Sequence, residues 1–170
     1  MNDQSIEVVE FSKFYMENVP RLIAFLVCQG VSVIDAADCV QETLIDALPP
    51  VWATLDYPYA WCRRVAHRKA YDLAQRRREA PVADPELVGS PLVAAGLNVE
   101  YFESDHEFLR WLAQLNGGKQ REILAWTYDG ATPTEIAAEL DMDPATVRST
   151  LRNARATLRR LRTREVSKND

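Results

Sequence analysis

The sequence predicts an all-α protein with two small helical domains joined by a flexible acidic linker, the second domain containing a helix-turn-helix. Apolar residues recur at three- and four-residue intervals along most of the chain, and the strand-type alternation of apolar and polar residues is absent. Glycine is scarce, with 6 in 170 residues. Prolines and glycines gather in one acidic segment, so we expect a linker at residues 81–104 between domains at 1–80 and 105–170.

The first domain should contain three helices. The first ends near Gly30, and Pro20 either kinks it or separates it into two. The second runs from about residue 33 to residue 48, where a pair of prolines ends it. The third begins near Pro58, a favourable residue for a first helical turn, and continues to about Arg78.

The second domain should contain four helices, at about residues 105–115, 120–128, 132–140 and 143–164. The last two have the layout of a helix-turn-helix. Thr132 and Glu135 have the spacing of a capping box, and Asp143 is placed to cap the final helix. Val147 and Leu151 lie four residues apart and should anchor that helix in the core.

The charge of the chain is unevenly distributed. The total is -5, from 20 basic and 25 acidic residues. Residues 61–78 nevertheless hold seven basic side chains and one acidic one, and residues 148–170 hold eight and two. Two basic segments within an acidic protein indicate two separate surfaces for nucleic acid, although solvated helix faces would give the same counts.

The final helix is the candidate for reading duplex DNA. In a helix-turn-helix, the outward-facing residues near the start of the second helix reach base edges and phosphates in the major groove. Those residues here are Thr146, Arg148, Ser149, Arg152 and Arg155. Three further arginines, Arg159, Arg160 and Arg162, extend the basic run and should contact backbone phosphates.

The other basic segment differs because aromatic residues accompany its charges. Tyr57, Tyr59, Trp61 and Tyr71 lie within or just before it. Cations interleaved with aromatic rings suit unstacked, single-stranded DNA, whereas burial in the core is the alternative for Trp61. On the preceding helix, one face is acidic, and a protein partner with a basic surface is the specific interpretation of that face.

Several function classes find no support in the sequence. An enzyme is not expected, because the chain has no glycine-rich phosphate loop, and neither His67 nor His106 lies at a recognisable spacing from a nucleophile. No metal or other cofactor is expected. Three cysteines without CxxC spacing are interpreted as small buried residues. Without a membrane-length apolar run or a signal peptide, we expect no membrane insertion and a cytoplasmic protein.

Three motifs together resemble the extracytoplasmic-function (ECF) sigma factors of bacterial RNA polymerase, the two-domain type of the sigma-70 family. The motifs are Asp35-Ala-Ala-Asp38-Cys-Val-Gln41-Glu42-Thr43-Leu, Tyr59-Ala-Trp61-Cys-Arg-Arg-Val65-Ala66, and Thr146-Val-Arg148-Ser149-Thr-Leu-Arg152-Asn-Ala-Arg155. Their order and spacing agree with that family. A helix-turn-helix alone would not be specific, because many repressors contain one.

The resemblance implies a role for each domain. The first domain would bind the β′ clamp helices of core RNA polymerase through Asp35, Asp38, Gln41 and Glu42. It would also recognise and melt the −10 element through Arg64, Arg68, Lys69, Tyr71, Asp72 and Arg76. The second domain would read the −35 element as duplex. The implied partners are core polymerase, including its β subunit, promoter DNA and an anti-sigma factor.

Two positions depart from the family pattern. Many relatives have Asn at the position of Arg68 and Arg at the position of Asn153, which leaves the preferred bases open. The alternative function is a stand-alone helix-turn-helix regulator with an N-terminal interaction domain. That alternative does not explain the aromatic, basic segment or the acidic face.

Overall fold

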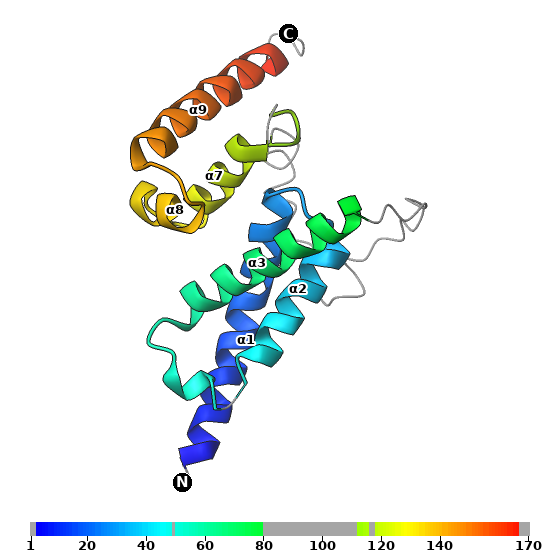
Figure 1. The fold of residues 1–170 in the computed structure, drawn as a ribbon, viewed down its shortest axis with the longest axis vertical. Coiled ribbons are helices and arrows are strands. Elements are labelled where there is room, and N and C mark those ends of the chain that lie inside the picture. The colour runs from blue at the N-terminus through cyan, green and yellow to red at the C-terminus, as the bar shows by residue number, and fades with distance from the viewer. Residues whose placement is uncertain (1–2, 49, 80–111, 116–117, 167–170) are drawn as a thin grey trace. The chain divides into compact units, whose positions relative to one another are not determined.

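The computed structural model describes residues 3–48, 50–79, 112–115 and 118–166. Every element of regular secondary structure in these ranges is helical, which confirms the predicted all-α class (Figure 1). The helices fall into two compact units, with α1, α2, η1 and α3 in the first and α7, α8 and α9 in the second. The predicted linker at 81–104, and most of the helix predicted at 105–115, lie outside the described residues.

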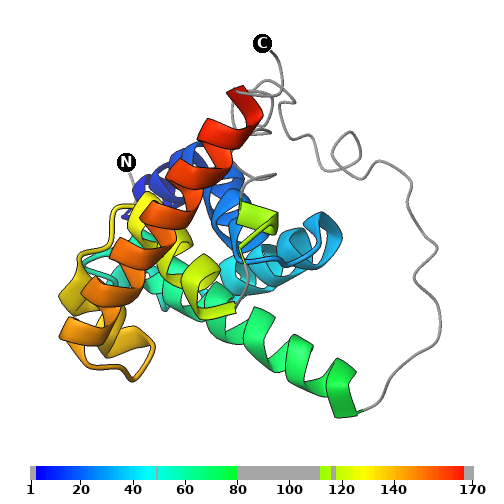
Figure 2. The same cartoon turned by 90° about the horizontal axis from the view of Figure 1, so that it is seen from above.

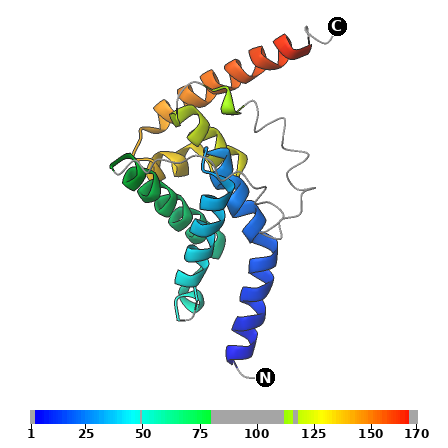
Figure 3. The same ribbon diagram turned by 90° about the vertical axis from the view of Figure 1, so that its right-hand side faces the viewer.

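The first helix of the chain, α1 (Asp3–Cys28), is continuous through Pro20 (Figure 3). Of the two alternatives predicted for Pro20, the separation into two helices is therefore wrong. Beyond Pro20 the helix buries Leu22, Phe25 and Leu26, and that burial outweighs the one backbone hydrogen bond that a proline removes. Gly30 ends the helix as predicted, because its φ of 101° lies in the left-handed region that glycine adopts without strain.

The second helix, α2 (Val33–Asp46), begins at a serine cap and ends two residues earlier than predicted. The Ser32 side chain accepts a hydrogen bond from the backbone N–H of Asp35. Ala47 is the C-cap, and Leu48 lies in the following turn, 43% exposed. The buried face of α2 consists of Ala36, Cys39, Val40, Thr43 and Leu44.

A short 3₁₀ helix, η1 (Trp52–Thr54), connects α2 to α3 (Pro58–Glu79), whose bounds agree with the prediction. The Trp52 ring makes edge-on contacts with Phe11 and Phe14, each with a centroid separation of 5.0 Å. These contacts hold the connection against α1. All three cysteines are buried and free, which confirms that they serve as small core residues.

The second unit contains α7 (Gly118–Tyr128), α8 (Pro133–Glu139) and α9 (Pro144–Val166), which is the longest of these three helices (Figure 2). Gly118 begins α7, two residues earlier than predicted. Gly130 ends α7 with a φ of 93°, and the N–H of Ala131 donates to the carbonyl of Trp126 at 3.0 Å. Both α7 and α8 pack against α9.

Within the described parts of the chain, no helix combines the length and the apolar character that a membrane crossing requires.

Candidate nucleic-acid interface

The two helices of the predicted helix-turn-helix begin at the predicted caps. Thr132 and Glu135 form a complete capping box: the Glu135 N–H donates to Thr132 Oγ1, and the Thr132 N–H donates to Glu135 Oε2 at 2.7 Å. Asp143 Oδ1 accepts hydrogen bonds from the N–H groups of Ala145 and Thr146, at 2.7 and 3.3 Å. The sequence therefore fixes where α8 and α9 start.

The turn between α8 and α9 depends on an aspartate in an unusual backbone conformation. Asp141 has a φ of 50°, and it is the one residue other than glycine with a positive φ among those described. The next N–H, that of Met142, donates to the carbonyl of Ala137 at 2.9 Å. Ile136 of α8 and Val147 of α9 are fully buried, so the turn holds two helices that share a core.

The solvent-facing side of α9 carries all five residues predicted to read duplex DNA. Thr146, Arg148, Ser149, Arg152 and Arg155 are exposed. Five arginines, at 148, 152, 155, 159 and 162, follow one another at intervals of four, three, four and three, which places them on one face of the helix. None of the five makes an ion pair within the described residues. This face is a cationic strip roughly 20 Å long.

The third helix, α3, exposes five of the six residues predicted to contact the −10 element. They are Arg64, Arg68, Tyr71, Asp72 and Arg76. The sixth, Lys69, is turned toward α2, where its Nζ lies 2.8 Å from Asp46 and 3.5 Å from Glu42. The hydrogen bond to Asp46 is the largest cause of the raised pKa of Lys69. Lys69 is thus engaged within the first unit.

The aromatic residues near α3 divide into covered and exposed rings. The guanidinium of Arg21 lies 4.1 Å from the centroid of the Tyr59 ring, which leaves that face unavailable to a base. Trp61 is half-buried. Tyr57 and Tyr71, at 79% and 57% exposed, are the rings that a DNA base can reach.

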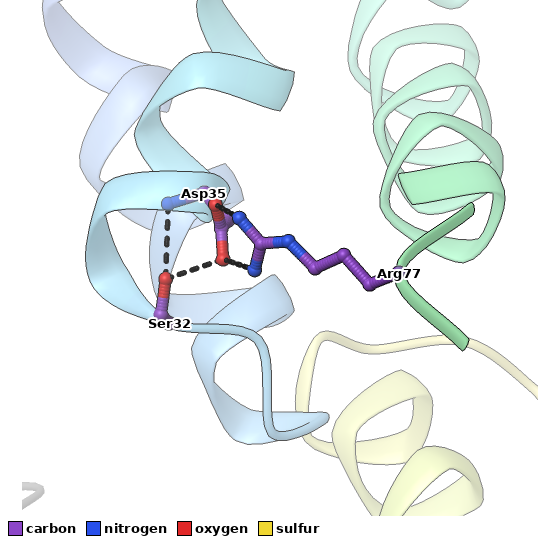
Figure 4. A network of polar contacts seen from close by, with 3 residues as sticks. All are labelled: Ser32, Asp35 and Arg77. Carbon is purple, nitrogen blue, oxygen red and sulfur yellow. Dashed lines mark hydrogen bonds and ion pairs between the residues drawn. The ribbon is translucent and has the colours of Figure 1, made fainter. Parts of the chain in front are cut away.

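The acidic face of α2 exposes three of its four predicted partner-binding residues. Asp38, Gln41 and Glu42 are exposed. Asp35 differs, because Arg77 of α3 binds its carboxylate with two hydrogen bonds (Figure 4). Arg77 was not among the predicted site residues. The two residues are 42 positions apart, and no local sequence signal connects them.

A groove of about 350 Å³ separates these faces of α2 and α3. Its charged lining consists of residues from both candidate sites and Arg77: Asp35, Asp38, Glu42, Lys69, Asp72, Arg76 and Arg77. The residues predicted to bind a protein and those predicted to bind opened DNA therefore line the same groove, which lies along the seam where α2 meets α3. Among the described residues, no group of three or more His, Cys, Asp or Glu side chains is arranged to hold a metal ion.

Two comparisons with known proteins bear on this geometry. Residues 107–158 match the family model "Sigma-70, region 4", which includes the whole of α7 and α8 and α9 as far as residue 158. The structure is also similar to that of the sigma factor RpoE from Bartonella quintana, solved in complex with the anti-sigma factor NepR. The TM-score is 0.61 and the identity 23%, over 91% of this chain and 97% of that one. No curated protein matches the chain.

The structural similarity extends over nearly all of both chains, and at 23% identity it establishes the fold. The family match is independent of it and falls on the helix-turn-helix. Residues 107–158 thus carry a sigma-70 region 4 domain, and together the two comparisons confirm the resemblance of this chain to the extracytoplasmic-function sigma factors.

Proposed function

We propose that the protein is a sigma factor that binds core RNA polymerase and directs promoter-specific initiation of transcription. The observation that carries this proposal is the pairing of a region 4 helix-turn-helix with a second exposed basic helix in another unit. A stand-alone regulator needs only the first of these surfaces. The sigma factor contributes no catalysis of its own, and its place of action is the cytoplasm, where polymerase works.

In this proposal, α9 enters the major groove of the −35 element. Arg148, Ser149 and Arg152 lie in its first turns, where side chains of a recognition helix reach base edges. Thr146 and Arg155 flank them. Farther along the same face, Arg159 and Arg162 contact phosphates and contribute affinity that does not depend on sequence.

The −10 element is bound as opened strand by α3. Arg64, Arg68 and Arg76 supply positive charge for the backbone, and the exposed ring of Tyr71 offers a surface on which a base stacks. Asp72 lies beside them and can accept a hydrogen bond from a base edge. Extruding a base costs a few kcal/mol of stacking free energy, which these contacts must return.

The acidic face of α2 is assigned to the β′ clamp helices, through Asp38, Gln41 and Glu42. The proposed domains are residues 1–80 for polymerase and the −10 element, 81–104 for the linker, and 105–170 for the −35 element. The β subunit remains a further proposed contact. The relative from Bartonella quintana was solved with an anti-sigma factor, and we include such a regulator among the partners.

The test is reconstituted transcription. The purified chain is added to bacterial core polymerase with fragments of genomic DNA from its source organism, and the 5′ ends of the transcripts are mapped. We expect discrete start sites that need both components and share −35 and −10 motifs. Start sites independent of the chain, or DNA binding unchanged by polymerase with no transcript, would contradict the proposal.

A matched pair of variants tests the polymerase surface. Glu42→Lys reverses an exposed charge on α2, and we expect it to weaken core binding and transcription together. Glu17→Lys makes the same change on α1, where Glu17 is exposed beside Lys13, and should leave both unchanged. Equal effects of the two variants would remove α2 from the proposed interface.

A further inference from the structure

The first turn of α2 and the last turn of α3 are joined by a three-residue network (Figure 4). Arg77 Nη1 and Nη2 donate to Asp35 Oδ2 and Oδ1 at 2.6 and 2.8 Å. The Ser32 hydroxyl donates to Asp35 Oδ2 at 2.6 Å and accepts from the Asp35 N–H at 3.1 Å. The serine that caps α2 therefore also orients the carboxylate that holds Arg77.

A second ionic contact joins the same helices near the other end of α2. Lys69 Nζ lies 2.8 Å from Asp46 Oδ2 in the last turn of α2. Lys69 and Arg77 are eight residues apart on α3, whereas their partners Asp46 and Asp35 are eleven apart on α2. Because the later residue of α3 pairs with the earlier residue of α2, the two contacts require antiparallel helices and fix them at two points.

The buried side chains that these two helices carry are mostly small. They are Ala36, Cys39, Val40, Thr43 and Leu44 on α2 and Cys62, Ala66 and Ala70 on α3. Small side chains interdigitate less deeply than large ones, so they resist sliding and rotation of one helix on the other less strongly. A bidentate pair has a defined geometry, so it can fix the position of one helix along the other where a core of small side chains does not.

Burial distinguishes Asp35 from the other acidic residues of α2. Its side chain is 13% exposed, against 66% for Glu42 and 52% for Asp46. An incoming basic partner can reach Glu42 directly, whereas it must first displace Arg77 to reach Asp35. The acidic residue at position 35 is placed for a contact within the unit.

We propose that Asp35 and Arg77 are positioning residues, which set the register of the DNA-binding helix α3 on the polymerase-binding helix α2. The roles of those two helices rest on the proposed function. In this account Asp35 does not contact polymerase, and Arg77 does not contact DNA. Polymerase docked on α2 then presents Arg68, Tyr71 and Arg76 to the −10 strand in a fixed orientation.

The test is a double-mutant cycle with a charge exchange. The variants are Asp35→Ala, Arg77→Ala, both together, and the exchange Asp35→Arg with Arg77→Asp. Arg78→Ala removes a neighbouring exposed arginine and serves as the control. For each variant, affinity for core polymerase and the rate of promoter opening by the reconstituted holoenzyme are measured separately.

Each single variant should slow promoter opening by roughly two- to fivefold, the range expected for a partly exposed ion pair. The double variant should be no slower than either single variant, and the exchange should recover most of the rate. Affinity for core polymerase should stay unchanged throughout. A purely structural loss would lower that affinity as well.

Three results would overturn the proposal. If Arg77→Ala slows opening but Asp35→Ala does not, Arg77 contacts DNA. If Asp35→Ala alone weakens core binding, Asp35 contacts polymerase. If the effects of the single variants add and the exchange fails to recover the rate, the two residues act separately.

A measurement on the free chain separates this proposal from the proposed function. Cys39 is buried and lines the groove beside Arg77. If α3 packs less firmly on α2, Cys39 should become exposed more often. Asp35→Ala and Arg77→Ala should therefore each speed the alkylation of Cys39, and the exchange should slow that alkylation again. Unchanged alkylation contradicts the positioning role even if transcription succeeds. Faster alkylation supports that role at the seam even if the wild-type chain starts no transcripts.

Discussion

Asp35 is held in its ionised form by two neighbours. Burial by itself would raise the pKa of its carboxyl group, but hydrogen bonds from Arg77 and Ser32 outweigh burial and leave the pKa below its ordinary value. The ionised form therefore stabilises the folded state. That contribution is complete above the pKa of an unfolded aspartate, about 3.9, and is lost as pH falls through the lowered folded pKa.

The lowered pKa of Asp35 gives a prediction for Asp35→Asn. Above about pH 5 the variant should be less stable than wild type by a constant amount, below about 1 kcal/mol because Arg77 is largely exposed. As pH falls below about 4, the difference should shrink, since wild type then loses the same charge. Urea unfolding at a series of pH values measures it. A difference that does not shrink as pH falls below about 4 would show that the substitution acts through packing instead of charge.

Asp35 and Lys69 also show that charge and helical position do not determine which group a single residue contacts. Both were predicted, from their charge and helical position, as contacts to outside partners. In the structure both are paired across the seam between α2 and α3, with residues 42 and 23 positions away in the chain. Pairings over such distances depend on how the helices pack, which no local pattern records.

At the scale of elements, the turn between α8 and α9 depends on one residue. Asp141 adopts a φ of 50°, a conformation that costs most side chains about 1–2 kcal/mol and costs a β-branched residue more. Glycine adopts it freely but loses more entropy on folding, so these effects nearly cancel for Asp141→Gly. We expect Asp141→Gly to change the free energy of unfolding by less than about 0.5 kcal/mol.

By the same reasoning, Asp141→Val should destabilise the chain by roughly 1–2 kcal/mol and lower −35 binding with it. Urea unfolding of the three proteins provides the comparison. Equal stability of the valine and glycine variants would mean that the turn does not require the left-handed conformation.

The arginine strip of α9 predicts two kinds of DNA contact along one helix. Arg148→Ala should relax preference at one position of the −35 element, at a cost of about 1–3 kcal/mol on the preferred sequence. Arg159→Ala, eleven residues later on the same face, should weaken binding equally on all sequences and reduce the salt dependence by about one phosphate contact. Holoenzyme binding to a set of −35 variants at several salt concentrations separates them. A uniform loss from Arg148→Ala would make it a phosphate contact.

Helix limits were the part of the fold that the sequence specified best. Thr132 with Glu135, Asp143, Gly30 and Gly130 all act on backbone groups within a few residues, so their spacing is visible in the chain. Pro20 left a break in the first helix open as an alternative, and α1 continues through it because the residues beyond it are buried. The end of α2 was predicted two residues too late, since Leu48 lies in the turn after the helix and is exposed.

For the whole molecule, the uneven distribution of charge along the chain affects how strongly the free protein binds DNA. The total of -5 opposes binding of the free chain to random DNA, while α3 and α9 each keep a cationic face. In the proposed function, docking on polymerase adds the second binding event at high effective concentration, so promoter binding should depend on polymerase.

The central claim is that this chain and core polymerase together open a promoter. The measurement is permanganate reactivity of thymines in a promoter found by the transcript mapping, with the chain, core polymerase, both, or neither. Unpaired thymines should become reactive near the −10 element only when both proteins are present, and Tyr71→Ala should reduce that reactivity. Reactivity that the chain produces without polymerase, or that polymerase produces without the chain, would contradict the account.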